Sequence, residues 1–292
     1  MIVGIVGVGI MGGAIATNLA AQGIAVRGVD PEPARQDHLR GIGAAVAGSA
    51  AEAGEGADLV VTSLPSIAAL EATVASLLAA PRAGLVVAEL STLPIPDKER
   101  CRDRLAAAGM ILLDCPLSGT GAQAATRDLA VYASGERNAY ERAVPVFERF
   151  ARVTHYLGAF GNGSRLKFVA NLLVAVHNVA SAEAMVLGLK AGLDAETIVK
   201  VISSGAGNSR VFELRAPLMA NSAYQPATMK IDVWQKDMSV IAAFAQGLGV
   251  ETPTFTATKP VYDAAQQAGL GADDTAAVCA LLERWAGVRR GS

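Results

Sequence analysis

The chain has 292 residues, enough for two domains, and 52% of them are hydrophobic while 18% are charged. This composition supports a substantial buried core and excludes an intrinsically disordered chain. The formal net charge of −2, without a long run of one sign, argues against nucleic acid or an anionic membrane as a partner.

Short apolar runs alternate with helical patterns through the first half of the chain. We predict strands at Ile2–Val6, Ala25–Asp30, Leu59–Ser63, Leu85–Glu89 and Met110–Asp114, with Leu129–Ala133 and Arg152–Tyr156 as possible extensions of the same sheet. The helical patterns cover Ile10–Gln22, Pro33–Gly41, Ile67–Leu78 and Pro96–Ala108. Strands that are apolar on both faces and separated by helices indicate a parallel sheet. Residues 1–162 should therefore form a doubly wound α/β domain.

The pattern changes after residue 160. From Ser164, a residue type suited to an N-cap, one helix should run to about Ala191 and stop at Gly192. The later segments are helical without a convincing strand, so residues 163–292 should form an all-α domain that contains the long interdomain helix. A helix that is roughly 40 Å long exceeds its own small domain. We expect it to bury its far side on a second copy, giving a homodimer or homotetramer.

The cysteines and the apolar segments indicate the compartment. Cys101, Cys115 and Cys279 have neither paired nor metal-like spacing, as a reducing cytosol permits, and the three histidines are scattered. The chain enters a predicted strand at once, without signal-peptide features. Polar residues interrupt the most apolar helix before it reaches the ~18 uninterrupted apolar residues of a membrane span. We expect a cytoplasmic protein with no metal site and no membrane span.

The first predicted strand leads directly into GVGIMG, whose residues are Gly7, Val8, Gly9, Ile10, Met11 and Gly12. This GxGxxG follows a strand and opens a helix, the context in which it marks a dinucleotide-binding Rossmann domain. Gly7 permits the tight turn, and Gly9 lets backbone amides approach a pyrophosphate. Gly12 allows the helix to pack closely on the strand. A turn that is merely glycine-rich is the alternative.

The second predicted strand ends at Asp30, 18 residues after Gly12. A carboxylate there accepts hydrogen bonds from ribose hydroxyls and repels a 2′-phosphate, which favours NAD over NADP. Arg27 and Arg35 are near enough in sequence to leave NADP open. The alternative for Asp30 is a turn residue before Pro31.

Three further loops follow predicted strands, where ligands of open α/β sheets bind. Leu64 and Pro65 should line the cofactor, and Ser91 and Thr92 fit equally as cofactor contacts or as caps of the next helix. The stretch DCPLSGTG offers a hydroxyl and several amides that suit a carboxylate, although a plain turn fits it as well. Its candidate residues are Ser118, Gly119 and Thr120.

The stretch GNGSRLKFVAN opens the long helix and places Lys167 and Asn171 four residues apart, on one face. A solvent-exposed stripe is the simpler interpretation of such a pair, because lysine is rarely buried. A second lysine, Lys236, lies in the later segment WQKDM.

Taken in order, GVGIMG, DCPLSGTGA, GNGSRLKFVAN and WQKDM closely resemble the motifs of the β-hydroxyacid dehydrogenase family, over nearly the whole chain. That family belongs to the 6-phosphogluconate dehydrogenase superfamily and includes 3-hydroxyisobutyrate dehydrogenases and semialdehyde reductases. The resemblance implies that Lys167 is catalytic and that Asn171 serves catalysis and substrate binding. It also implies that Ser118 and Gly119 hold the substrate and that Lys236 lies beside the nicotinamide.

The implied reaction is hydride transfer between NAD(H) and a small β-hydroxy acid or its semialdehyde. Lys167 would give a proton to the carbonyl oxygen in reduction and take it back in oxidation. A free lysine with a pKa near 10.4 is a poor base at neutral pH, and burial in a cleft would lower that value.

The sequence departs from the family pattern at Thr120, at Leu172 and in the segment TRDL at 126–129. All three positions touch or neighbour the substrate side, so fold and hydride chemistry carry over better than substrate identity. An imine reductase is one alternative, although those enzymes usually lack the lysine at 167. A non-catalytic module that senses dinucleotides is another, but it would not need the substrate motifs.

Overall fold

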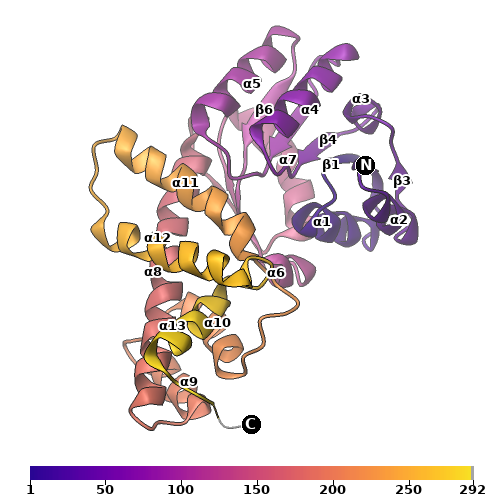
Figure 1. Cartoon of the computed structure of the whole chain (residues 1–292). Helices are drawn as coiled ribbons and strands as arrows, with labels where there is room; N and C mark the ends of the chain where they lie inside the picture. The colour runs from indigo at the N-terminus through magenta and orange to yellow at the C-terminus, as the bar shows by residue number, and fades with distance from the viewer. Residues whose placement is uncertain (291–292) are drawn as a thin grey trace. The chain divides into compact units, whose positions relative to one another are not determined.

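The computed structural model describes residues 1–290. The chain forms two compact units, Met1–Lys167 and Phe168–Ser292 (Figure 1). This division falls five residues after the expected one at 162/163. The long helix α8 (Asn162–Lys190) begins within the first unit, because the amide of Ser164 donates a hydrogen bond to the carboxylate of Asp114, at the end of a strand.

The first unit contains a six-stranded sheet whose strands all run parallel. Its strands are β1 (Ile2–Val6), β2 (Ala25–Val29), β3 (Ala45–Val46), β4 (Leu59–Thr62), β5 (Val86–Glu89) and β6 (Ile111–Asp114). They are ordered β3-β2-β1-β4-β5-β6, so the chain returns to the middle of the sheet between β3 and β4. This order confirms the predicted doubly wound fold, in which ligands bind where the strand order reverses.

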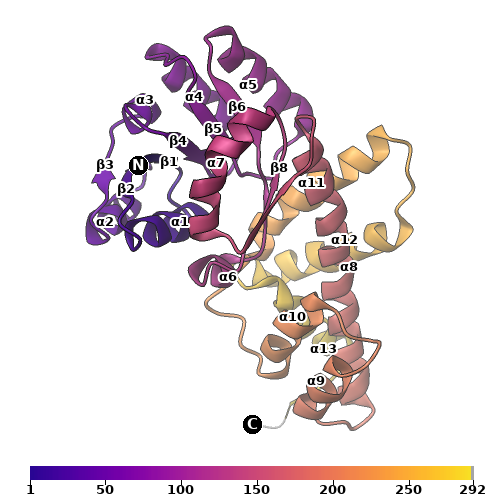
Figure 2. The ribbon, with the colours of Figure 1, turned by 180° about the vertical axis from the view of Figure 1, so that it is seen from behind.

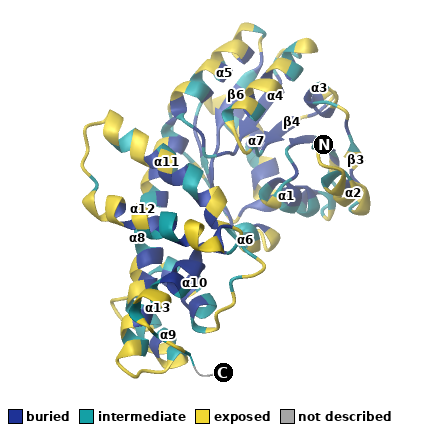
Figure 3. Ribbon diagram, in the orientation of Figure 1, coloured by how far each residue is buried: buried dark blue, intermediate teal, exposed yellow. Residues whose placement is uncertain are grey.

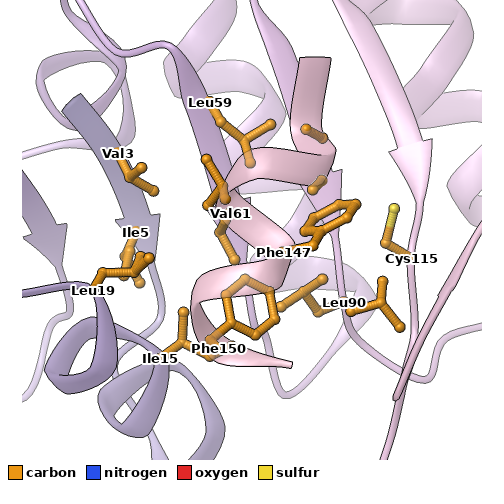
Figure 4. Close-up of a cluster of buried hydrophobic side chains, with 14 of the residues drawn as sticks. Val3, Ile5, Ile15, Leu19, Leu59, Val61, Leu90, Cys115, Phe147 and Phe150 are labelled. Atoms are coloured by element: carbon orange, nitrogen blue, oxygen red, sulfur yellow. The ribbon is translucent and has the colours of Figure 1, made fainter. Parts of the chain in front are cut away.

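Helices cover both faces of this sheet (Figures 1 and 2). One face carries α1 (Ile10–Ala20), α2 (Pro33–Gly41) and α7 (Arg137–Phe150), and the other carries α3 (Ala50–Gly54), α4 (Ile67–Ala79) and α5 (Ile95–Ala107). Successive strand side chains point to opposite faces, so Val61 faces α1 and α7 while Val60 faces α4. Figure 4 shows the first of these two cores, with Val3, Ile5, Ile15, Leu19, Leu59, Val61, Phe147 and Phe150.

The expectation that Leu129–Ala133 and Arg152–Tyr156 extend the main sheet is wrong. They form β8 (Ala130–Ala133) and β9 (Val153–Tyr156) of a separate sheet, ordered β7-β8-β9, whose first strand is β7 (Leu117–Ser118). The two sheets meet at a single bridge between Asp114 and Ser134, which exchange both backbone hydrogen bonds. Beyond that bridge the chain turns through Pro116, which has no amide to donate to a continued ladder. The short helix α6 (Gly121–Ala125) follows β7.

The second unit is helical, as predicted. Its helices after α8 are α9 (Ala195–Ser203), α10 (Arg210–Ala220), α11 (Ile231–Gly247), α12 (Pro253–Ala265) and α13 (Val278–Ala286), with short turns at Gln266–Leu270 and Thr275–Ala277. The long helix begins at Asn162, so Ser164 lies inside it and is not its N-cap. It ends before Gly192, which adopts a φ of +85°. Figure 3 shows buried and exposed residues interspersed along these helices, and the buried residue of α9 is Ile198.

Helix α8 is long and apolar enough to cross a membrane by length and composition alone, which differs from the sequence-based expectation. That expectation counted uninterrupted apolar runs, whereas a mean hydropathy over 18 residues tolerates polar ones. The core helix of a folded domain meets the same criteria. In α8, Ala175 and Met185 are fully buried, and Asn178 donates hydrogen bonds to the Tyr262 hydroxyl and the Thr275 carbonyl.

Candidate active site

The glycine turn between β1 and α1 is tightly packed at two positions and open at the third. Gly7 has a φ of +86°, and a Cβ there would lie 2.2 Å from the carbonyl oxygen of Ser63. A Cβ on Gly12 would lie 2.0 Å from the carbonyl oxygen of Gly7, whereas a Cβ on Gly9 would have no described atom within 4 Å apart from those of Gly9 and its chain neighbours. Gly7 and Gly12 therefore shape the turn, and open space lies beside Gly9.

The N-terminus of α1 faces this turn with backbone amides. Gly9 is its N-cap residue and has no side chain to accept from the first-turn amides. Such amides, together with the helix dipole, form an anion site. Val8 is buried, Met11 is half-buried and Ile10 is 47% exposed. The three apolar side chains of the motif therefore lie in different environments. Open space and unshared amides fit the pyrophosphate of a dinucleotide.

Asp30, directly after β2, supports the same turn. Its Oδ2 accepts from the amide of Val8 at 2.7 Å, and its Oδ1 accepts from the amide of Glu32 at 3.0 Å. A carboxylate has about four acceptor positions, so two remain for ribose hydroxyls. The two nearby arginines bond elsewhere, since Arg27 donates to the carbonyls of residues 52 and 55 and Arg35 pairs with Glu32.

The loops after β4 and β5 are joined by a hydrogen bond. The amide of Leu64 donates to the hydroxyl of Ser91 at 2.7 Å, and Pro65, next to Leu64, is exposed. The alternative of helix caps is wrong for Ser91 and Thr92, because α5 begins at Ile95 and its N-cap is Pro94. Ser91 thus orders the loop that was predicted to line the cofactor.

The predicted substrate stretch forms β7 and the turn into α6. Ser118 is half-buried at the end of β7, and Gly119 follows with a φ of +134°. Thr120 is the N-cap of α6 in a capping box, where its amide donates to Oε1 of Gln123 at 3.1 Å. The departure from the family pattern at Thr120 therefore has a structural role as a helix cap.

Lys167 and Asn171 lie one turn apart on α8. Lys167 is half-buried, and Asn171 is buried in the second unit, where its Nδ2 donates to Oδ2 of Asp237 on α11 at 3.0 Å. The other oxygen of Asp237 lies 3.2 Å from Nζ of Lys236. One buried carboxylate therefore holds both Asn171 and Lys236, which come from motifs more than 60 residues apart.

Sequence reasoning gave no role to Asp237 and missed three buried charged residues of the first unit, Glu89, Lys98 and Asp114. A usable signal existed, because Glu89 and Asp114 each end an apolar strand. An acidic residue in that position needs a partner when the sheet is covered on both faces.

Among the described residues, the structure does not support a cysteine nucleophile or a metal site. Burial, and next the charge of Asp114, raises the pKa of the Cys115 thiol well above its ordinary value, so Cys115 is not a nucleophile at neutral pH. Within residues 1–290, no group of three or more His, Cys, Asp or Glu side chains lies close enough to hold a metal ion.

Known proteins share both units. Residues 2–158 match the family described as the NAD binding domain of 6-phosphogluconate dehydrogenase. Residues 161–282 match the family described as NAD-binding of NADP-dependent 3-hydroxyisobutyrate dehydrogenase. An L-threonate dehydrogenase of Cupriavidus necator is 33% identical, with 94% of each chain covered.

Two solved structures extend the likeness to the fold. The 3-hydroxyisobutyrate dehydrogenase of Salmonella typhimurium superimposes with a TM-score of 0.87 at 30% identity, covering 96% of this chain and 99% of that one. The protein Psf3, solved with NADP+ and 2-OPP, gives a TM-score of 0.89 at 25% identity, covering 96% of this chain and 99% of that one. With a Rossmann unit that fits a nicotinamide dinucleotide and a helical unit of matching fold, this chain is an oxidoreductase that belongs to the β-hydroxyacid dehydrogenase family.

Proposed function

We propose that the protein is an NAD-dependent dehydrogenase of a small β-hydroxy acid, or of the corresponding semialdehyde, with Lys167 as general acid and base. The observation that carries this proposal is the contact of Asn171 with Asp237. A carboxylate can only accept, so the amide nitrogen of Asn171 must face Asp237. Its Oδ1 is then the atom that accepts a hydrogen bond from a substrate hydroxyl or from the Lys167 ammonium.

Lys167 donates the proton in reduction and accepts it in oxidation. The nicotinamide, when bound, supplies or accepts the hydride at the carbinol carbon. Negative charge that develops on the substrate oxygen is stabilised by the ammonium of Lys167, which donates its proton to that oxygen. In the reverse direction the amine of Lys167 takes the hydroxyl proton.

The remaining predicted residues bind and orient. The hydroxyl of Ser118 and the amide of Gly119 suit a substrate carboxylate, because Gly119 turns the backbone at a strand end. The amide of Thr120 already donates to Gln123, so Thr120 supports this turn as the cap of α6. Lys236, held by Asp237, adds a positive charge that suits either the cofactor or that carboxylate. We assign residues 1–162 to the cofactor, with Ser118 and Gly119 also serving the substrate, and residues 163–292 to the rest of substrate binding and to self-association.

The preference for NAD rests on Asp30. Its carboxylate would meet the adenosine ribose and repel a 2′-phosphate. Arg27 and Arg35, which would otherwise favour a 2′-phosphate, already have acceptors on the protein.

Self-association and the cytoplasmic location are part of the same proposal. Helix α8 exposes Val169, Leu173 and Leu187, which are 55%, 49% and 74% exposed, and a second copy of the chain would cover them. Sedimentation should therefore show a dimer or tetramer, and a monomer at micromolar concentration would contradict it. All three thiols are buried and unpaired, which suits a reducing compartment.

The decisive experiment is a panel of small hydroxy acids and semialdehydes, including L-threonate and 3-hydroxyisobutyrate, assayed with NAD and NADP by nicotinamide absorbance. Lys167→Ala should lose activity by about 1000-fold or more, because removing the proton donor and its charge removes both effects. Lys190→Ala, on the same helix and exposed, is the matched control. Full activity of a folded Lys167→Ala variant that binds NAD would refute the assignment. A chain that binds dinucleotide but turns over no substrate of the panel would favour the non-catalytic alternative.

A further inference from the structure

Lys98 is a fully buried lysine between two fully buried carboxylates. Its Nζ lies 2.5 Å from Oε2 of Glu89 and 2.8 Å from Oδ1 of Asp114. Glu89 and Asp114 end the neighbouring strands β5 and β6 and are paired in register. Two carboxylates at adjacent positions repel each other, and the ammonium of Lys98, reaching in from α5, compensates this repulsion.

The same ammonium contacts the loop that was predicted to line the cofactor. Lys98 Nζ donates to the carbonyl oxygen of Ser91 at 2.6 Å. Ser91 is held at two more atoms, because its amide donates to Oε1 of Glu89 at 2.8 Å and its hydroxyl accepts from the amide of Leu64. The loops after β4 and β5 are thereby connected to Lys98.

The ammonium also contacts the first turn of α8. Lys98 Nζ lies 3.2 Å from the hydroxyl of Ser164, which itself donates to Oδ1 of Asp114 at 2.7 Å. The amide of Ser164 donates to Oδ2 of the same carboxylate at 2.8 Å. Asp114 thus caps α8 from outside the helix, and Lys167 lies three residues further along.

Energetics argue that this cluster does more than stabilise the fold. A buried ion pair often contributes less to stability than well-packed apolar side chains of the same size, because its charges must be desolvated. Burial by itself lowers the pKa of Lys98, but Asp114 and Glu89 outweigh it and raise the pKa above the ordinary value. Lys98 therefore stays charged at physiological pH. Its three N–H groups donate to Ser91, Asp114 and Ser164. Glu89 is held as an ion pair.

We propose that Lys98 is a positioning residue. It fixes the position of Ser91, in the loop after β5, relative to Ser164, in the first turn of the helix that carries Lys167. The inference rests on the proposed role of Lys167 and adds a residue that touches neither substrate nor cofactor. A single atom, Nζ, contacts both segments, so a shift of either one breaks a charge-assisted hydrogen bond. A displacement of about 1 Å between reacting groups slows a positioned reaction by about 100-fold.

The test is the double variant Lys98→Met/Glu89→Gln. It removes one positive and one negative charge together, and the amide oxygen of the introduced glutamine side chain can still accept from Ser91. We expect a folded protein with cofactor Kd and substrate KM close to those of the parent, and a kcat about 10- to 100-fold lower. A larger deuterium isotope effect on kcat, with substrate deuterated at the carbinol carbon, would show that hydride transfer is the slowed step. An unchanged kcat, or a loss that saturating cofactor restores, overturns the proposal.

A milder variant decides the matter if the double variant does not fold. Ser164→Ala keeps both ion pairs and the backbone cap of α8 but removes the hydroxyl between Lys98 and the helix. That hydroxyl accepts from Lys98 and donates to Asp114, and the first of these bonds joins Lys98 to α8. We expect kcat to fall about threefold to tenfold, as the loss of that bond, about 1 kcal/mol, implies. The matched control is Ser181→Ala, a buried serine of α8 whose hydroxyl bonds within the helix. Equal kcat in the two serine variants contradicts the proposal, whereas full activity of Lys167→Ala would instead refute the proposed function.

Discussion

A pair of alanine substitutions in the glycine turn separates folding from cofactor binding. Gly9→Ala and Gly12→Ala add the same methyl group three residues apart. The methyl on Gly12 would lie 2.0 Å from the carbonyl oxygen of Gly7, whereas the methyl on Gly9 would meet no described atom within 4 Å beyond its chain neighbours. The Gly12 change strains the turn, and the Gly9 change occupies the space assigned to the pyrophosphate.

Gly12→Ala should lower the stability of the fold, whereas Gly9→Ala should weaken cofactor binding. Overpacking of this sort costs about 1–3 kcal/mol, and at about 2–4 °C per kcal/mol Gly12→Ala should lower Tm by about 2–12 °C. Gly9 has a φ of −66°, which alanine adopts readily, so the stability of Gly9→Ala should stay within about 1 kcal/mol of the parent. Displacing the pyrophosphate from even one charge-assisted amide contact costs about 1.5–3 kcal/mol, or roughly 10- to 100-fold in Kd.

Thermal unfolding and titration of NADH fluorescence measure the two effects independently. The reasoning fails if Gly9→Ala binds NADH as tightly as the parent. It also fails if Gly12→Ala melts at the parental temperature, because the close contact with Gly7 would then have no cost.

Four other outcomes follow from single groups. Asp30→Ser should shift the ratio of kcat/KM toward NADP, and an unchanged ratio would exclude Asp30 as the determinant. Arg127 has a φ of +61°, so Arg127→Gly should raise the free energy of unfolding in urea by up to about 1 kcal/mol; a loss of stability would contradict this. Burial opposes ionisation of Asp274, but Arg215 and several hydrogen bonds lower its pKa below the ordinary value. The stability that this carboxylate contributes is present above about pH 4 and is lost as the pH falls further. Acid denaturation should therefore show that the free energy of unfolding lost in Asp274→Asn at neutral pH becomes smaller at low pH. Burial, followed by Glu283, raises the pKa of Cys279 to about 12, and burial also raises the pKa values of Cys101 and Cys115. Thiol reagents at pH 8 should therefore label the protein only after unfolding.

Local patterns in the sequence were sufficient for most of the fold. The predicted bounds of β1 and α2 match the structure, and α8 starts and ends within two residues of the prediction. Each of these elements carries its own signal, either apolar residues at a regular period or a glycine or proline at an end. The two-residue strand β3 and the short helix α3 have too few residues for a period, and they were missed.

Contacts between distant segments required the tertiary structure. Nothing near residues 130 or 153 in the sequence says that β8 and β9 leave the main sheet. Serine is a common N-cap residue, but the hydroxyl of Ser164 donates a hydrogen bond to Asp114, 50 residues earlier.

The sequence by itself determined the family, the glycine turn and the candidate lysine, because each rests on residues that are neighbours along the chain. The tertiary structure decided which charges share a buried space. Asp237 reaches Asn171 across 66 residues, and Lys98 reaches both Glu89 and Asp114. A buried charge must find its partner wherever the fold brings one, and spacing along the chain does not encode that choice.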